Sequence, residues 1–555
     1  MTPTFSSAGW AAALVVALAA CGPDQAAPDA CAGAACPAID AELGRPDDAA
    51  TVGDGGGGGD GGGGCTGPGC ACGDPIAGET CCGDGLDNDG DGRTDCDDAD
   101  CAAAPACAPG CPALAPVDDA ALAFEATTNV TASTTADGFA DDYVFNQAGT
   151  IKLGTRRDWG GSIVFFGEAD GSPGGNRSNA IDGADTGREV QIALYDPDRW
   201  YQGCAWSSSC ATGNPPTPCP QEMTYLGWNP VQGGNRCNHG SGTDAVVLAD
   251  GAITTTTTPL FWNPNWDRQD CSSAACGNPA VDRRRGDVEV VQRVRFVRSN
   301  TVELSYAVTN LADLDHGSAI QEFPTVYAAF GRQGTPDLAA LFDSTQHQIA
   351  IDQAGGGTFR YRNFTSASGW VTFQNAAHDY GVGIFYENGN PSFQAWQADD
   401  PHFNNVRAMF GFALPGHGQV RARAYLILGS LATVATEAAW LTAHLAPFGS
   451  LDVPAAGADV SGVVAVHGWA LDNRGVAAVH LVVDGGAPIA LAYGESRPDV
   501  CRVWPGYPRC AAGTVGYGGS FDASALPPSD CGHVVEVVAT DTDGNQRVIA
   551  RQRVY

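Results

Sequence analysis

Short runs of apolar residues alternate with polar residues through most of the chain after residue 122. Gly, Asn, Asp and Pro, which favour turns, separate the runs. An apolar residue at every second position is typical of a strand that buries one face. The pattern predicts strands at residues 143–145, 162–166, 190–195, 287–297, 301–308, 381–386 and 421–428.

Helical periodicity is confined to one stretch, residues 431–445. Because strands and loops account for the rest of residues 113–447, this segment is predicted to form one large antiparallel β-sandwich. The expected fold class is therefore all-β.

Residues 450–555 form a second, smaller β pattern, with apolar runs at 460–472, 476–485 and 533–541. About seven short strands in roughly 100 residues predict an Ig-like β-sandwich. The sequence also resembles bacterial Ig-like modules, in the GWALD start at residues 468–472 and the RPDV and PGYP elements of residues 497–508. That resemblance implies a spacer or adhesion unit, with a disulfide between Cys501 and Cys510 across the loop.

The first 21 residues have the pattern of an export signal. Residues 10–20 are apolar, but 11 residues are too few to cross about 30 Å of hydrocarbon as a helix. They end in Leu-Ala-Ala-Cys, which resembles the lipobox of bacterial lipoproteins and implies cleavage before Cys21 and lipidation of its sulfur. We expect an exported lipoprotein of the outer membrane or cell surface; the alternative is an ordinary secretory signal with an accidental cysteine.

Composition supports export and excludes a nucleic-acid partner. The chain has 29 Lys plus Arg against 63 Asp plus Glu, whereas phosphate binding needs a basic surface. It also has 21 cysteines, and removing Cys21 leaves an even number, which favours disulfides in an oxidising compartment. Residues 22–75, rich in Gly, Ala, Asp and Pro, are predicted to be a disordered tether.

Residues 76–112 contain regularly spaced carboxylates framed by cysteines. With Asp87 at position 1 of a Ca²⁺ loop, the other ligands are Asp89, Asp91, the carbonyl of Arg93, Asp95 and Asp98. The segment resembles the Cys-framed DxDxDG repeats of thrombospondin type 3 and of secreted myxobacterial proteins. It predicts a structural Ca²⁺ site that stiffens the stalk; the alternative is a solvated acidic linker.

Several motifs of the middle segment resemble secreted bacterial proteins of the galactose-mutarotase-like supersandwich type. They lie at residues 160–163, 185–191, 227–234, 321–324 and 425–429. The resemblance implies a concave sheet that faces carbohydrate, as in aldose epimerases and many polysaccharide lyases.

Aromatic and hydrogen-bonding residues near the expected strand ends have the chemistry of a sugar site, because sugars offer hydroxyl edges and weakly apolar C–H faces. The candidate ligand-binding residues are Trp159, Arg188, Gln191, Trp228, Asn229 and Gln232. Core packing of each Trp and a simple turn at each glycine-rich stretch are the alternatives.

Glu322 is the candidate catalytic carboxylate, with His316 as its acid partner and His239 or His378 as alternatives. The histidine motifs of true mutarotases are absent. We therefore expect a surface protein that recognises carbohydrate or a cell-surface glycan. An epimerase, glycosidase or lyase that uses Glu322, and a purely structural or adhesive protein, remain alternatives.

Overall fold

A computed structural model describes residues 114, 117, 122, 125, 127, 130–134, 138–169, 178–183, 188–196, 227–233, 239–262, 283–355, 357–389, 392–400, 402–529 and 531–555. The lipobox at Cys21, the tether and the calcium ligands expected between Asp87 and Asp98 lie outside these residues. The described residues belong to two compact units: Leu122–Leu445 with Cys501–Ala511, and Ala446–Val500 with Ala512–Tyr555.

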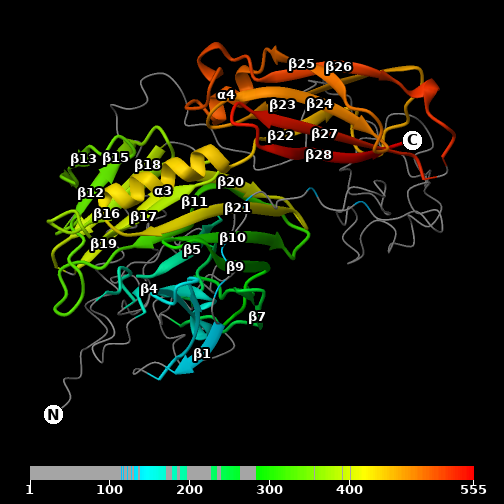
Figure 1. Cartoon of the computed structure of the whole chain (residues 1–555). Coiled ribbons are helices and arrows are strands. Elements are labelled where there is room, and N and C mark those ends of the chain that lie inside the picture. Colours follow the sequence, from blue (N-terminus) through cyan, green and yellow to red (C-terminus); the bar gives the residue numbers. More distant parts are fainter. Residues whose placement is uncertain are drawn as a thin grey trace, which may run out of the picture. The chain divides into compact units, whose positions relative to one another are not determined.

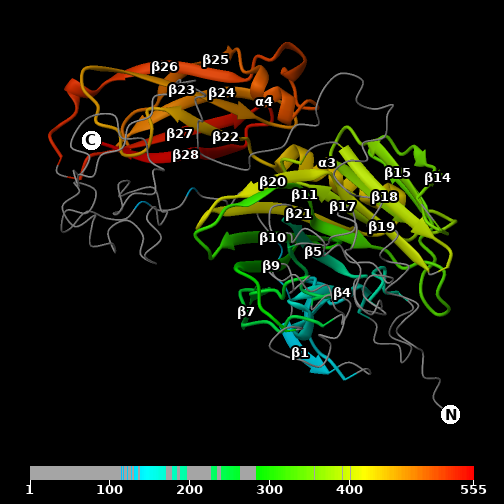
Figure 2. The same cartoon turned by 180° about the vertical axis from the view of Figure 1, so that it is seen from behind.

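The first unit is built from two antiparallel sheets (Figures 1 and 2). In the described part of the chain, one sheet has twelve strands in the order β1-β2-β3-β4-β5-β11-β19-β18-β15-β14, with β6 paired to β5 and β20 to β11. Its strands are β1 (Val130–Thr134), β2 (Ala140–Phe145), β3 (Ile151–Arg156), β4 (Ser162–Glu168), β5 (Val190–Tyr195), β6 (Gly227–Trp228), β11 (His316–Tyr327), β14 (Gln353–Ala354), β15 (Arg360–Thr365), β18 (Ser392–Ala398), β19 (Phe403–Ala408) and β20 (Phe410–Leu414).

The other sheet has nine strands among the described residues, in the order β13-β12-β16-β17-β21-β10-β9-β8-β7. They are β7 (Ala245–Ala249), β8 (Ala252–Thr257), β9 (Val288–Arg298), β10 (Thr301–Asn310), β12 (Ala340–Asp343), β13 (Gln348–Ile349), β16 (Trp370–Gln374), β17 (Gly381–Tyr386) and β21 (Gln419–Leu428).

One apolar core lies between these two sheets. It combines buried residues of the first sheet, such as Ile192 and Val406, with residues of the second, such as Phe296 and Leu304. The alternation seen in the sequence explains it, because every second side chain of β9 and β10 points inward. The predicted fold class is confirmed: the protein is all-β, with a large antiparallel sandwich.

Helix α3 (Leu431–His444) packs on β16, β17 and β21 of the nine-stranded sheet (Figure 1). It begins where the Ser430 hydroxyl accepts a hydrogen bond from the backbone N–H of Thr433, a typical N-cap. Its buried residues, Val434 among them, join Tyr425 and Ile427 in a second apolar cluster. The predicted helix is thus confirmed. None of the helices in the described residues has the length and apolarity needed to cross a membrane.

The second unit has seven antiparallel strands among its described residues, the number expected from the sequence. They are β22 (Phe448–Val453), β23 (Val463–Leu471), β24 (Val476–Val483), β25 (Ile489–Glu495), β26 (Gly516–Asp522), β27 (His533–Asp541) and β28 (Gln546–Val554). They surround a separate core that includes Val466, Leu481 and Val537. That this unit is an Ig-like module stays a prediction.

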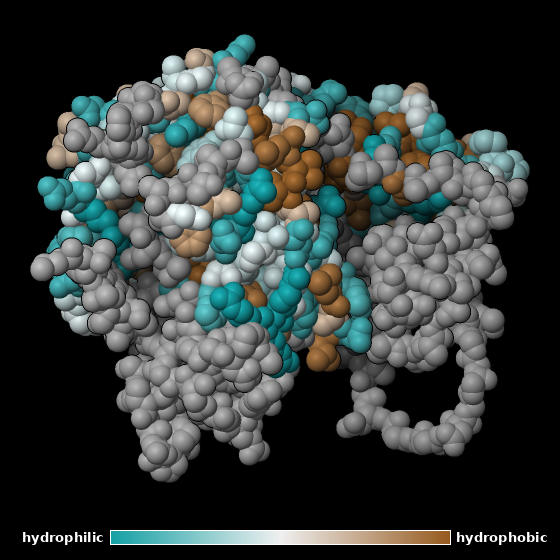
Figure 3. All heavy atoms as spheres, turned by 90° about the horizontal axis from the view of Figure 1, so that it is seen from below, coloured by the Kyte–Doolittle hydropathy of each residue, from teal (hydrophilic) through white to brown (hydrophobic). Residues whose placement is uncertain are grey.

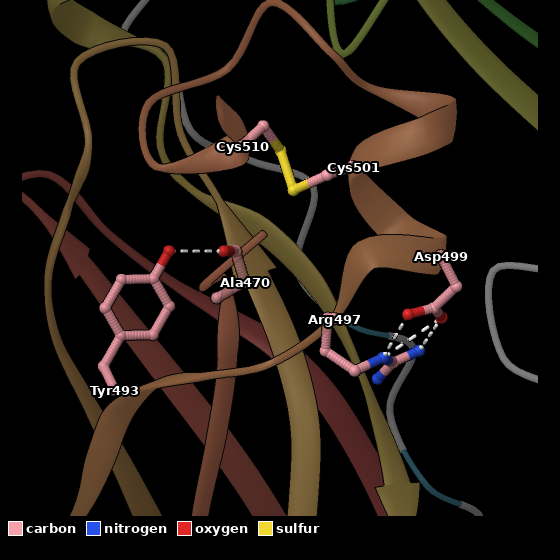
Figure 4. The surroundings of a disulfide bond; sticks show 6 residues. All are labelled: Ala470, Tyr493, Arg497, Asp499, Cys501 and Cys510. Atoms are coloured by element: carbon pink, nitrogen blue, oxygen red, sulfur yellow. Dashed lines mark hydrogen bonds and ion pairs between the residues drawn. A yellow bond between two sulfur atoms is a disulfide. The ribbon is translucent and has the colours of Figure 1, made fainter. Parts of the chain in front are cut away.

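The disulfide between Cys501 and Cys510 forms as expected (Figure 4). Cys501 lies in the short helix α4 (Pro498–Val503). Figure 4 also shows the Arg497 guanidinium on the Asp499 carboxylate, with hydrogen bonds of 2.7–3.1 Å. The segment of residues 497–510 is thus stabilised by an ion pair and a disulfide, and not by pairing with a neighbouring strand.

Large apolar side chains are exposed at few places in the described residues. Val247 and Leu248 are 55% and 37% exposed on β7, an edge strand of the nine-stranded sheet, and Leu314 is 64% exposed in the loop before β11. On the face drawn in Figure 3, hydrophobic residues form small groups beside hydrophilic ones.

Replacing Leu304 with Ala will destabilise the large sandwich, because the side chain is fully buried between the sheets. We expect a loss of about 2–5 kcal/mol in the free energy of unfolding, measured by chemical denaturation. The matched control is Leu314→Ala, for which we expect a change within about 0.5 kcal/mol. Equal losses for the two variants would contradict the assigned core.

Asp472 gives the second unit a pH-dependent stability. Burial, together with the carboxylates of Asp541 and Asp543, raises its pKa from 3.8 to about 6. A carboxyl with a raised pKa in the folded state favours folding when protonated, so this contribution is lost as the pH rises from about 4 to about 6.

Asp472→Asn should therefore stabilise the protein by about 1–3 kcal/mol at pH 7 and have little effect at pH 4. The amide oxygen can still accept the backbone N–H groups of Arg474 and Gly475. Thermal unfolding between pH 4 and 8 measures the effect. Asp522→Asn, an exposed carboxylate that accepts from the N–H of Ser524, is the control. A gain of equal size at pH 4 and pH 7 would rule out this origin.

Candidate functional site

The face of the twelve-stranded sheet that points away from the core carries polar side chains. On β5, Val190, Ile192 and Leu194 lie in the core, so Gln191 and Tyr195 point to the opposite face. The same alternation applies to β18 and β19. On β11 the register shifts between Glu322 and Thr325, so both of these residues, three positions apart, lie on the face opposite the core. We call this set of residues the polar row: Tyr195 and Gln191 of β5, Glu322 and Thr325 of β11, Arg407 and Asn405 of β19, and Gln394 of β18.

Glu322 is at the centre of the polar row. Its Oε1 accepts a hydrogen bond from the Tyr195 hydroxyl at 3.0 Å and lies 3.2 Å from Nη1 of Arg407. The other terminal nitrogen of Arg407 donates to Oε1 of Gln394 at 3.1 Å. Glu322 and Arg407 are 2% and 5% exposed. The network is therefore buried and charge-assisted, and it joins four neighbouring strands, β5, β11, β19 and β18.

Both the backbone and the ring of Tyr195 have contacts that fix its position. The side-chain amide of Gln321 accepts from its N–H at 2.6 Å and donates to its carbonyl at 3.0 Å. Gly227 lies opposite Tyr195 and has a φ of 116°, where a Cβ would come 1.9 Å from the carbonyl oxygen of Leu194. This close approach places β6 beside β5, and the ring of Trp262 lies 5.4 Å from that of Tyr195.

Aromatic rings occupy the same face of the sheet beyond Arg407. Tyr361 and Trp396 are stacked with ring centroids 4.9 Å apart, and Tyr327 meets Phe403 edge to face at 5.4 Å. Burial, and then the negative charge of Glu322, raise the pKa of Tyr327 well above its ordinary value. Its hydroxyl therefore stays neutral and can donate a hydrogen bond.

Gln191 and Thr325 lie opposite each other in the β5–β11 pairing. Within the described part of the molecule, Oε1 of Gln191 and Oγ1 of Thr325 are buried without a hydrogen-bond partner. Such atoms normally have one, because leaving a buried polar atom unpaired costs about 1–3 kcal/mol. Both oxygens lie on the same face of the sheet as Glu322.

Three of the residues predicted to bind ligand have structural partners instead. Trp159 packs on Val231, and the guanidinium of Arg156 lies 4.3 Å from its ring. Trp228 is part of the core between the sheets. Asn229 caps a turn, since its Oδ1 accepts from the N–H groups of Val231 and Gln232 at 2.8 Å. The Gln232 side chain is buried at the end of the same turn.

Gln191 and Arg188 come closer to the predicted role. Gln191 belongs to the polar row, and Arg188 lies 5.4 Å from the ring of Phe403 at the aromatic end of this face. Arg188 also donates to the carbonyl of His402 and lies 3.8 Å from Asp182. The structure therefore brings two of the six predicted binding residues to one face, together with Glu322.

The structure does not bring Glu322 and His316 together as an acid–base pair. Both lie on β11, six positions apart, which corresponds to roughly 20 Å along a strand. His378 packs against Phe342 at 4.7 Å, and His239 exchanges backbone hydrogen bonds with Gly233. Among the described residues, no cluster of three or more His, Cys, Asp or Glu side chains is arranged to hold a metal ion.

Sequence reasoning missed Tyr195, Arg407 and Gln394. Tyr195 ends a predicted strand and lies four positions after Gln191. Strand alternation therefore places both side chains on the same face and could have identified Tyr195. The other two lie on β18 and β19, whose sequences SFQAWQA and FNNVRA have a weaker β pattern and were not predicted as strands.

No protein-family model matches the chain, and no match was found among curated proteins. Solved structures do match. A galactose mutarotase related enzyme from Lactobacillus acidophilus is 12% identical, covers 52% of this chain and 97% of its own, and has a TM-score of 0.32. An aldose epimerase homologue from C. elegans is 9% identical, with 52% and 99% covered and a TM-score of 0.29.

A polysaccharide lyase is 9% identical at a TM-score of 0.29, and the match covers 73% of this chain and 47% of the lyase. At these TM-scores the matches carry no argument about activity. The chain is thus similar to solved mutarotase-type and lyase structures, and its site has to be interpreted from its own residues.

Proposed function

We propose that this protein binds carbohydrate through the polar row and the aromatic rings beside it. The observation that carries the proposal is the network from Gln394 through Arg407 and Glu322 to Tyr195, next to the stacked Tyr361 and Trp396. Sugar hydroxyls need donors and acceptors at fixed positions, and sugar C–H faces pack on aromatic rings.

The geometry favours recognition over turnover. Oε1 of Glu322 is already engaged by the Tyr195 hydroxyl and Arg407, and the predicted partner His316 is roughly 20 Å away along β11. One observation favours the second candidate, a carbohydrate-active enzyme. A Tyr195 hydroxyl 3.0 Å from a carboxylate is within proton-transfer distance.

Tethering is the other part of the proposal. The lipobox ending at Cys21 would anchor the chain in a membrane, and the glycine-rich residues 22–75 would hold the folded units away from it. Ca²⁺ at the Asp87–Asp98 loop would stiffen the stalk.

Tyr195→Phe removes a single hydroxyl that orients Glu322, so we expect affinity for the bound glycan to fall by about 5- to 10-fold. The mature chain would first be screened on a glycan array and the best glycan then measured by calorimetry. Tyr493→Phe is the matched control, since it removes a hydroxyl bond of 2.8 Å to Ala470 in the other unit. A wild-type chain that binds no glycan would refute the proposal.

Product analysis with the same glycan separates binding from turnover. A recognition protein leaves the glycan intact. New reducing or unsaturated ends that disappear in Glu322→Gln would establish the enzymatic alternative.

The calcium motif is testable in the full chain. Asp89→Asn together with Asp91→Asn should remove one equivalent of bound Ca²⁺, measured by calorimetry, because two ligands lose their charge. Asp97→Asn, at the non-ligand position 11 of the loop, should leave the stoichiometry unchanged. If the double variant keeps the full stoichiometry, the loop is an acidic linker.

A further inference from the structure

Strands β9 and β21, which lie on either side of β10 in the nine-stranded sheet (Figure 1), carry five arginines. Four of them have a polar partner: Glu303 for Arg295, Glu437 for Arg298, Gln419 for Arg421 and Glu387 for Arg423. Arg293 differs from these four, because within the described part of the chain its guanidinium makes no hydrogen bond and no ion pair.

The surroundings of Arg293 disfavour its positive charge. Val294 of the same strand lies in the core, so the Arg293 side chain points to the outer face of the sheet, where it is half-buried. Burial, and then the charge of Arg295, lower the pKa of Arg293. The carboxylates of Glu303 and Asp250 act in the opposite direction, but more weakly. Because a guanidinium keeps its proton in proteins, Arg293 stays charged without full compensation.

A hydroxyl side chain lies opposite Arg293 on each side. Thr254 of β8 and Ser305 of β10 are its partners in the two strand pairings, which places their Cβ atoms about 4.5–5.5 Å from that of Arg293. Both residues are half-buried, and among the described residues neither hydroxyl has a hydrogen-bond partner. Beyond Ser305, Arg423 of β21 is next in line. We call Thr254, Arg293, Ser305 and Arg423 the arginine row.

The arginine row has the donors and the charge that an anion needs. The Arg293 guanidinium has five N–H donors, and the two hydroxyls can turn their O–H groups toward an acceptor. The charge of Arg423 is compensated by Glu387 at 3.3 Å, so Arg293 supplies the excess positive charge. Because Ser305 is short and accessible to solvent, a small group can lie over it between the two guanidiniums.

We propose that the arginine row binds a small oxyanion of the phosphate or sulfate type, with Arg293 as its main ligand. Guanidinium groups recognise such anions through charge-assisted hydrogen bonds. The net charge of −34 opposes the approach of a long polyanion, which favours a small one. The row belongs to the nine-stranded sheet and the polar row to the twelve-stranded sheet, so this site does not depend on the proposed binding of carbohydrate.

The test is calorimetric titration of the full mature chain with sodium phosphate and with sodium sulfate, at constant ionic strength set by chloride. We expect Arg293→Gln to weaken binding by about tenfold or more, because it removes charge-assisted hydrogen bonds. Arg293→Lys keeps the charge and should recover part of the loss. Ser305→Ala should weaken binding by about threefold. Asp250→Asn removes a competing carboxylate and should strengthen binding by about twofold.

Arg474→Gln is the matched control, since it removes an arginine charge from the other unit, where Arg474 pairs with Asp543 at 3.2 Å. It should leave the affinity unchanged. A wild-type chain that binds neither ion, or an Arg293→Gln variant with wild-type affinity, overturns the proposal.

Glucose 6-phosphate in place of phosphate identifies the source of the anion. Tighter binding than that of the inorganic ion assigns the row to a phosphorylated sugar, and equal or weaker binding assigns it to the free ion. Both results support an oxyanion site, provided that Arg293→Gln weakens them. Failure of the glycan screen would leave this titration unaffected.

Discussion

Alternate residues of β5, β18 and β19, together with Phe323 and Val326 of the irregular strand β11, pack in the apolar core between the two sheets. This packing decides which side chains the opposite face of these strands can carry. The large core is shared by strands from both sheets and cannot admit a charge without a partner. Polar side chains of these strands are therefore directed to the opposite face. There, Gln394, Arg407 and Glu322 fall beside one another because their strands are adjacent.

Burial on that face imposes a second condition. A guanidinium and a carboxylate removed from water are tolerated only when further hydrogen bonds satisfy them. Gln394 supplies a bond to Arg407 and Tyr195 supplies one to Glu322. The network is thus interdependent, and a change at Tyr195 affects all of its members.

The sequence predicts the fold better than the site. Alternation located β5, β10 and β21, and helical periodicity located the helix at Leu431, because both patterns are local. It could not show that β5 pairs with β11, more than 120 residues later, nor which face each strand buries. Trp159 and Trp228 were predicted to bind ligand because an indole can stack on a sugar. Both indoles instead pack in apolar clusters, a role that the residue type alone does not exclude. Gln191 was chosen as a hydrogen-bonding residue near an expected strand end and Glu322 as a candidate catalytic carboxylate, and the β5–β11 pairing places both on the polar face.

The exposed β7 strand has a consequence for how copies of this chain behave together. Among the described residues no strand pairs with its outer edge, which lies beside the exposed Val247 and Leu248, and such an edge can pair with an adjacent molecule. Asp244, before the strand, is paired with Arg285, whereas Asp250 follows the strand directly, and the chain as a whole carries a net charge of −34. Two copies that approach through this edge each carry a large negative charge, so electrostatic repulsion opposes their aggregation.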